Sequence, residues 1–101
     1  MARFTTRVQL DGYPKEEDYT KLHQAMKRKG FSRFIASTDG TTYRLPHAEY
    51  NLVADRTIKQ VRDNAVAAAE SVWNDIQVLV TEGTRSWHGL KEATTAEVAV
   101  G

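Results

Sequence analysis

The stretch RFTTRVQL, residues 3–10, alternates between polar and apolar side chains and predicts the strand around which the other elements pack. One side of the extended chain would carry Phe4, Thr6, Val8 and Leu10, and the other Arg3, Thr5, Arg7 and Gln9. A period of two with β-branched residues predicts a half-buried strand. Residues 11–14 end it, because they contain glycine and proline, which interrupt regular elements.

Two helices are predicted, one in the first half of the chain and one in the second. Residues 15–29 carry acidic side chains in the first turn and basic ones in the last, which suits the helix dipole, and Gly30 follows at the usual place for a C-terminal glycine. Residues 55–73 have an alanine-rich middle and an apolar stripe. Asp55 or Thr57 can cap this second helix.

Three further strands are predicted. Residues 31–38 and 41–45 flank Asp39-Gly40, a dipeptide typical of a tight hairpin turn. Pro46 then marks a break, after which residues 48–53 continue the third strand. Residues 76–81 are almost continuously apolar, which predicts a well-covered strand.

The element order is therefore βαββαβ, and the fold class is α+β. Short connections and right-handed crossovers favour the ferredoxin-like arrangement, a four-stranded antiparallel sheet with two helices on one face. We expect one domain over residues 3–82, followed by an irregular C-terminal segment, residues 83–101, with a mobile tail. The other face of the sheet would stay open, and function or dimerisation would have to use it.

Composition excludes several classes of function. The chain has 101 residues, no cysteine and a net charge of only +1, so disulfides, thiolate metal sites and a strong overall field for nucleic acid are absent. Neither a secretory signal nor an apolar run of membrane-spanning length is visible in the sequence. We expect a cytoplasmic protein without a membrane partner.

The open face is predicted to be basic although the chain is nearly neutral. With Phe34 and Ala36 turned inward and Ile35 outward, it would carry Arg3, Arg7, Arg33 and Arg44. Arginines grouped in this way bind phosphate backbones. The alternative is that they only keep exposed strands from pairing with other chains.

No nucleotide-binding loop, metalloprotease motif or nucleophile elbow occurs. Asp11 lies just past the first strand, where an acid can bind Mg²⁺ or orient water, although aspartate before glycine is also ordinary turn chemistry. His47 is a candidate general base, whereas His23 lies on an apolar helix stripe and is interpreted as a packed core residue.

Several segments resemble the GhoS-type endoribonuclease antitoxins of type V toxin–antitoxin systems. Residues 8–14 (VQLDGYP) are similar to that family's strand end followed by Asp, an aromatic residue and Pro, with Gly12 inserted. Residues 26–32 (MKRKGFS) are similar to its helix end and Phe-Ser strand start, and Ile35-Ala36, Gly40 and Arg44-Leu45 to its hairpin. The resemblance covers residues 4–82; the tail from Gly83 departs from it.

The resemblance implies a ferredoxin-like RNA-binding protein that cleaves single-stranded mRNA. Asp11, Arg28 and Arg33 fall in the matching segments and would be catalytic, with Asp11 holding Mg²⁺ or a water and the arginines holding phosphate. Arg3, Arg7, Arg33 and Arg44 would bind the RNA. The alternative is a non-catalytic interaction module that forms a homodimer through its open face or a free edge strand.

Overall fold

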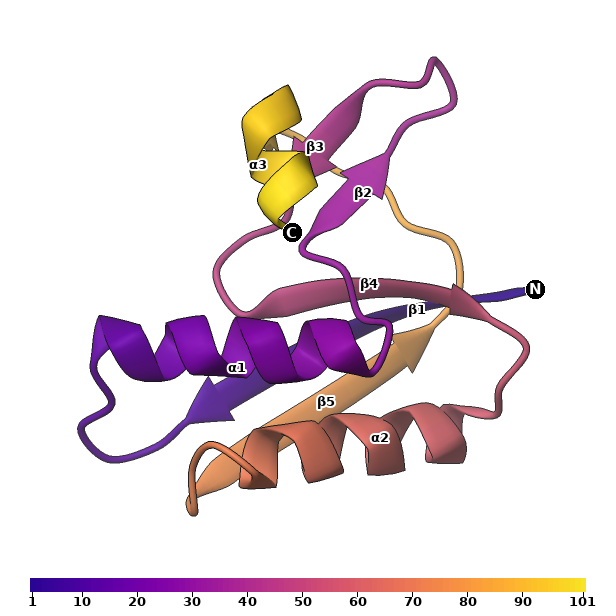
Figure 1. Cartoon of the computed structure of the whole chain (residues 1–101). Helices are drawn as coiled ribbons and strands as arrows, with labels where there is room; N and C mark the ends of the chain where they lie inside the picture. The colour runs from indigo at the N-terminus through magenta and orange to yellow at the C-terminus, as the bar shows by residue number, and fades with distance from the viewer.

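Antiparallel pairing sorts the strands into two separate three-stranded sheets (Figure 1). The computed structural model describes residues 1–101. The elements in chain order are β1 (Ala2–Leu10), α1 (Glu16–Arg28), β2 (Phe34–Ala36), β3 (Thr42–Arg44), β4 (Glu49–Ala54), α2 (Ile58–Glu70), β5 (Ile76–Glu82), β6 (Lys91–Glu92) and α3 (Thr95–Val100). The main sheet has the order β4-β1-β5, and the hairpin sheet the order β2-β3-β6.

The alternation predicted for β1 is confirmed. Phe4, Thr6, Val8 and Leu10 are buried, whereas Arg3, Arg7 and Gln9 are exposed. Figure 1 shows α1 and α2 on the same face of the main sheet, and side chains of both helices share one core with β1. That core includes Leu22, Ala25 and Met26 of α1 and Val61, Ala65, Ala68 and Ala69 of α2.

Both helices begin and end close to where the sequence predicts. Glu16, Glu17 and Asp18 form the first turn of α1, and Gly30 follows its last turn with a φ of 92° that side chains disfavour. At the start of α2, Thr57 rather than Asp55 is the cap: its hydroxyl accepts from the Gln60 amide at 3.1 Å, and the Gln60 side chain accepts from the Thr57 amide at 2.9 Å.

The predicted four-stranded sheet does not form, because the second strand divides at Arg33. Ser32 pairs with Asn51 of β4 through two backbone hydrogen bonds of 2.8 and 2.7 Å. Beyond that bridge the chain leaves the main sheet, and β2 pairs only with β3. The turn at Pro46 has a comparable effect, since residues 49–54 do not extend β3 but form β4 beside β1.

One prediction of side-chain direction, for the second strand, is wrong. In the hairpin sheet Ile35 is buried, at 4% exposure, and Ala36 is exposed, the reverse of the expectation, because β2 does not share the pleat of the main sheet. On β5 the apolar run is covered on one face only, and Leu79 is 66% exposed. The Asp39-Gly40 turn is confirmed, with Gly40 at a φ of 87°.

The C-terminal segment holds two short elements that the sequence patterns did not predict. β6 pairs with β3, and α3 follows, with Thr94 capping its first turn. Two contacts attach α3 to the rest of the chain: an ion pair of 3.3 Å between Arg44 and Glu97, and a hydrogen bond of 3.0 Å from Lys27 Nζ to the Val100 carbonyl. The segment before β6, residues 83–90, is irregular, as predicted.

Candidate nucleic-acid interface

The open face of the main sheet carries β1's two arginines, but it is less basic than predicted. The strand register places Arg3 opposite Val53 and Arg7 between Glu49 and Leu79. Residues directly opposite each other in a sheet share a face. Arg7 therefore has a carboxylate neighbour on β4 that the sequence patterns did not indicate, and Val53 and Leu79 add exposed apolar surface.

A third arginine lies over this face, from the irregular segment after β5. Arg85 Nη1 donates to the Phe4 carbonyl at 3.0 Å and to Thr5 Oγ1 at 3.4 Å. Burial lowers the pKa of Arg85, and the neighbouring positive charge of Arg3 lowers it further. Neither arginine has an ion pair. Two guanidinium groups are thus close together without a neutralising partner.

A pocket of about 490 Å³ opens beside these two arginines. We call it the Trp87 pocket; it lies where the open face, β2 and the irregular segment meet. Its lining residues are Arg3, Ile35, Ala36, Ser37, Thr38, Asn51, Val53, Arg85, Ser86 and Trp87. No carboxylate is among them. Trp87 contacts Tyr43 of β3, with ring centroids 5.8 Å apart and planes tilted by 61°.

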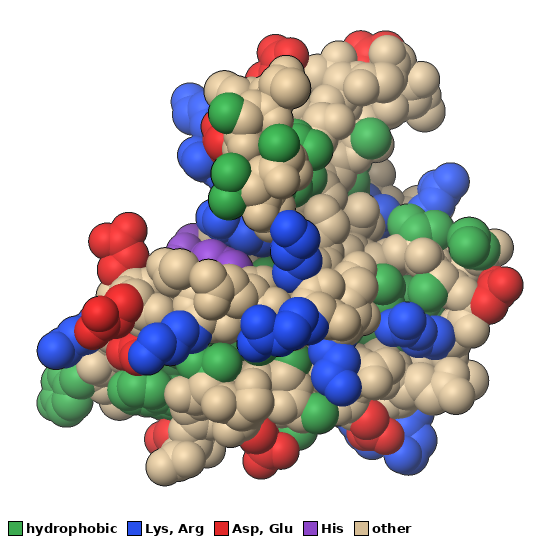
Figure 2. Space-filling view, in the orientation of Figure 1, with side chains coloured by type: hydrophobic (Ala, Val, Ile, Leu, Met, Phe, Trp, Pro, Cys, Tyr) green, Lys and Arg blue, Asp and Glu red, His purple; other side chains and the backbone are tan.

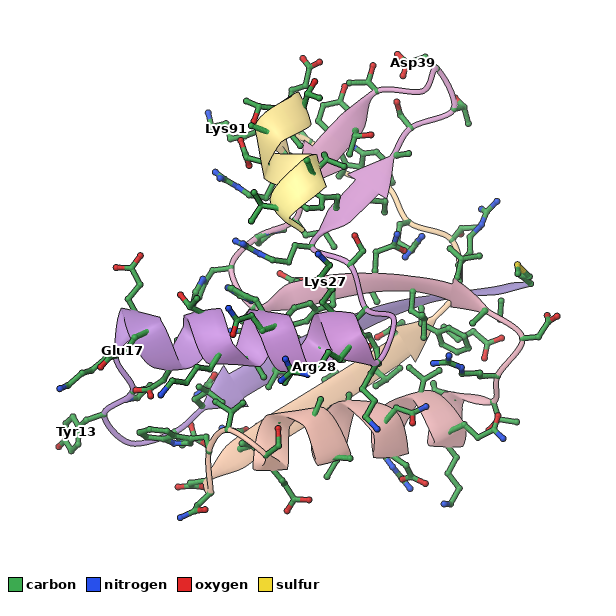
Figure 3. The ribbon with its side chains drawn as sticks, in the orientation of Figure 1. Tyr13, Glu17, Lys27, Arg28, Asp39 and Lys91 are labelled. Atoms are coloured by element: carbon green, nitrogen blue, oxygen red, sulfur yellow. The ribbon has the colours of Figure 1, made fainter.

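A second, smaller concavity of about 300 Å³ lies at the other side of the junction between hairpin and body. We call it the basic hollow. Its lining residues are Arg33, Arg44, Leu45, Pro46, His47, Leu90 and Lys91. Figure 2 shows basic side chains along the hairpin sheet next to the purple histidines, and Figure 3 labels Lys91. No acid lines it, and Glu97 pairs with its Arg44 at 3.3 Å.

The backbone around Pro46 builds this hollow. The Glu49 amide donates to the Pro46 carbonyl at 3.1 Å, which closes a tight turn, and Ala48 within it has a φ of 59°. A left-handed alanine costs about 1–2 kcal/mol, and such strain is concentrated at functional sites. The turn leaves His47 exposed at the mouth of the hollow, with its ring 4.4 Å from that of Tyr19.

Behind His47 lie two polar rings, the half-buried His23 and the fully buried Tyr50. His23 Nδ1 and the Tyr50 hydroxyl are 2.7 Å apart. Burial, then the charge of Arg33 and the proximity of His47, lower the pKa of His23 to about 4, so its imidazole is neutral near neutral pH. Burial raises the pKa of Tyr50. His23 is thus a packed and hydrogen-bonded residue, as the helix stripe predicted, while the exposed imidazole of His47 is the one that can exchange protons with a ligand.

The predicted catalytic residues lie apart. Asp11 is at the end of β1, where its carboxylate accepts from Gln9 at 2.7 Å and from Gln77 at 2.9 Å. Arg28 is the last residue of α1 (Figure 3). This helix begins five residues after Asp11, and its 13 residues span about 20 Å, so Arg28 lies at the end of the helix away from Asp11. No group of three or more His, Asp or Glu side chains could hold a metal ion.

The predicted RNA-binding residues divide between the two sites. Arg33 and Arg44 line the basic hollow and Arg3 lines the Trp87 pocket. Arg7 lines neither and lies on the open face beside Gln9, Gln77 and Leu79. Sequence reasoning did not assign Arg85 and Lys91 to a site, because both come from the C-terminal segment. The run Arg85-Ser86-Trp87, a basic residue next to an aromatic one in an irregular segment, was the available signal.

Comparison with known proteins gives no neighbour: no family model, no curated protein and no solved structure matches the chain. None of the helices has the length and apolar character needed to cross a bilayer. The function of the chain must therefore be inferred from the geometry of the two sites.

Proposed function

We propose that this protein binds single-stranded RNA, with the RNA phosphates in the basic hollow. The observation that carries the proposal is the convergence of Arg33, Arg44, His47 and Lys91 from separate segments of the chain, with no carboxylate among the residues that line the hollow. Cationic groups gathered in this way bind a phosphate backbone and release its counterions. Two of these residues, Arg33 and Arg44, are also predicted from the sequence alone.

The arrangement of strands supports a distant ferredoxin-like relationship as part of this proposal. The main sheet places β1 between β4 and β5, and the Ser32–Asn51 bridge puts the start of the second strand next to β4. A ferredoxin-like sheet has this order, with its second strand reduced here to one bridge. The similarity to GhoS-type antitoxins, carried by residues 4–82, points to the same ligand class.

The hollow also contains the groups needed to cut a bound strand. His47 is the exposed imidazole that could take the proton of a ribose 2′-hydroxyl while its oxygen attacks the adjacent phosphorus. The bond from phosphorus to the 5′-oxygen of the next nucleotide would break, leaving a 2′,3′-cyclic phosphate, and Lys91 could give that leaving oxygen a proton. The neighbouring arginines could stabilise the charge on the phosphoryl group. In contrast, the carboxylate of Asp11 is occupied by the amides of Gln9 and Gln77. Cleavage, if the RNA is cut, is therefore proposed at the hollow.

The test is a titration of labelled single-stranded RNA with the full chain at several salt concentrations, read by fluorescence anisotropy. We expect affinity to fall steeply with salt, and Arg33→Ala to weaken binding while Arg62→Ala, on the exposed side of α2, does not. An RNA affinity that does not change with salt concentration, or that both variants weaken equally, would refute the phosphate model. Gel analysis of the same samples reports cleavage.

A second candidate function is homodimerisation through β5, which is a free edge of the main sheet. Leu79 lies at the centre of the strand Ile76–Glu82 and is 66% exposed. Antiparallel pairing of β5 with its own copy about this centre would place the two Leu79 side chains opposite each other and bury both. Sedimentation would show a concentration-dependent dimer that Leu79→Lys abolishes; a monomer at all concentrations excludes this function.

A further inference from the structure

The Trp87 pocket carries positive charge that no acidic residue neutralises. Arg3 and Arg85 both line it, neither has an ion pair, and no lining residue is acidic. Arg85 uses Nη1 for the Phe4 carbonyl and Thr5 Oγ1, and its other N–H groups have no partner. Guanidinium groups bind phosphate in a two-pronged geometry, so an anion between these side chains would relieve their mutual repulsion.

Part of the pocket lining is apolar and includes an indole. Ile35, Val53 and Trp87 form it, and the contact between Trp87 and Tyr43 fixes the position of the indole. Proteins that bind single-stranded nucleic acid hold planar nucleobases by stacking them on aromatic side chains. The wall thus fits a flat ring attached to the anion.

Polar groups also line the pocket. The hydroxyls of Thr38 and Ser86 lie among the lining residues and make no hydrogen bond within the chain. Asn51 also belongs to the wall, where its Nδ2 donates to the Phe34 carbonyl at 3.2 Å and its buried Oδ1 has no partner.

From these features we propose that the Trp87 pocket binds a single nucleotide, with its phosphate between Arg3 and Arg85 and its base against Trp87. The volume of about 490 Å³ lies in the lower half of the range for small-molecule sites, which suits one nucleotide. The inference deepens the proposed function and takes its ligand class from it. In the bound RNA this nucleotide would belong to the same strand as those whose phosphates occupy the basic hollow.

The experiment is calorimetric titration of the full chain with adenosine 5′-monophosphate, with adenosine and inorganic phosphate as separate probes. We expect the nucleotide to bind at least about tenfold more tightly than either fragment, since the pocket contacts both parts. Binding should quench the fluorescence of Trp87. Trp73, whose indole Nε1 donates to the Asp11 carbonyl at 2.7 Å in the body of the protein, serves as the unaffected reference.

Arg3→Gln is the first variant, because Arg3 donates no side-chain hydrogen bond within the chain and its loss leaves the fold intact. It should weaken nucleotide binding at least about tenfold, and Arg85→Gln should do the same. Arg62→Gln is the matched control. No nucleotide binding, equal binding by Arg3→Gln and the unaltered chain, or binding of phosphate alone as tightly as the nucleotide would each overturn the inference.

Failure of the inference is distinguishable from failure of the proposed function. RNA that binds in a manner sensitive to Arg33→Ala, together with no binding of free nucleotide, would refute the pocket and leave the RNA-binding function standing. Nucleotide that binds while RNA of any length does not would refute the function and keep the pocket.

Discussion

His23 Nδ1 lies 2.7 Å from the hydroxyl oxygen of Tyr50, and this contact joins α1 to β4 beneath the turn that carries His47. The pKa of His23 is lowered from 6.5 to about 4, first by burial and then by Arg33 and His47. The neutral imidazole is therefore part of the packing between helix and sheet, and protonating it would oppose folding.

The first prediction concerns stability in acid. Between pH 6.5 and about 4 the unfolded chain binds a proton at His23 and the folded chain does not, so the free energy of unfolding falls as the pH is lowered through this window. His23 is only half-buried, which limits the loss to about 1–2 kcal/mol. Urea unfolding of the unaltered chain and of His23→Gln at pH 7, 5 and 4 measures it. A constant difference between the two proteins at all pH values would contradict the prediction.

The second prediction concerns the salt dependence of RNA binding. Lys91 lines the basic hollow, whereas Lys59 pairs with Asp63 on α2 at 2.8 Å, far along the chain from it. Lys91→Ala should weaken RNA binding and reduce the slope of log affinity against log salt by about 0.7, the value for one phosphate contact to a single strand. Lys59→Ala should leave the slope unchanged. The same slope in both variants would remove Lys91 from the interface.

The third prediction concerns Asp11. Its carboxylate accepts hydrogen bonds from Gln9 and Gln77, and both can persist when one oxygen remains as an amide. Asp11→Asn should therefore cost less than about 1 kcal/mol of stability and leave RNA affinity unchanged, with or without EDTA. Anisotropy and thermal unfolding test this. Loss of RNA cleavage in the folded variant would instead place Asp11 in a catalytic role, as the family resemblance implies.

The fourth prediction concerns the strained turn. Ala48 is buried with a φ of 59°, a conformation that is unfavourable for alanine and much more so for a β-branched residue. Ala48→Val should destabilise the fold by at least about 2 kcal/mol, whereas Ala48→Gly should change stability by less than about 1 kcal/mol because relief of strain offsets the lost methyl group. If valine is tolerated as well as glycine, the turn is not strained.

Sequence patterns were sufficient for the parts of this fold that depend on near neighbours. The alternation of residues 3–10, the charge arrangement and Gly30 at the ends of α1, and the Asp39-Gly40 turn are all local signals, and the structure agrees with each. The cap of α2 at Thr57 was one of two alternatives, decided by its reciprocal bonds with Gln60.

The remaining features depend on contacts between distant residues. Nothing local in residues 31–38 shows that pairing with Asn51 stops at Ser32, so the sequence could not separate the hairpin sheet from the main sheet or turn Ile35 inward. The Trp87 pocket likewise depends on the hydrogen bond from Arg85 to the Phe4 carbonyl of β1, and these two residues are 81 positions apart in the chain. Site residues from the C-terminal segment were missed for this reason.

The single bridge between Ser32 and Asn51 has a consequence for local unfolding. The two sheets share one backbone-paired residue pair and one side-chain hydrogen bond, from Asn51 to the Phe34 carbonyl. The hairpin sheet can therefore open as a cooperative unit without disrupting the core under α1 and α2. Backbone amides of β2 and β3 should therefore exchange their hydrogens faster than those of β1. Both candidate sites lie where the hairpin sheet meets the main sheet, so a ligand bound at either site should slow hydrogen exchange in β2 and β3. Deuterium uptake by the hairpin sheet would then report that a site is occupied.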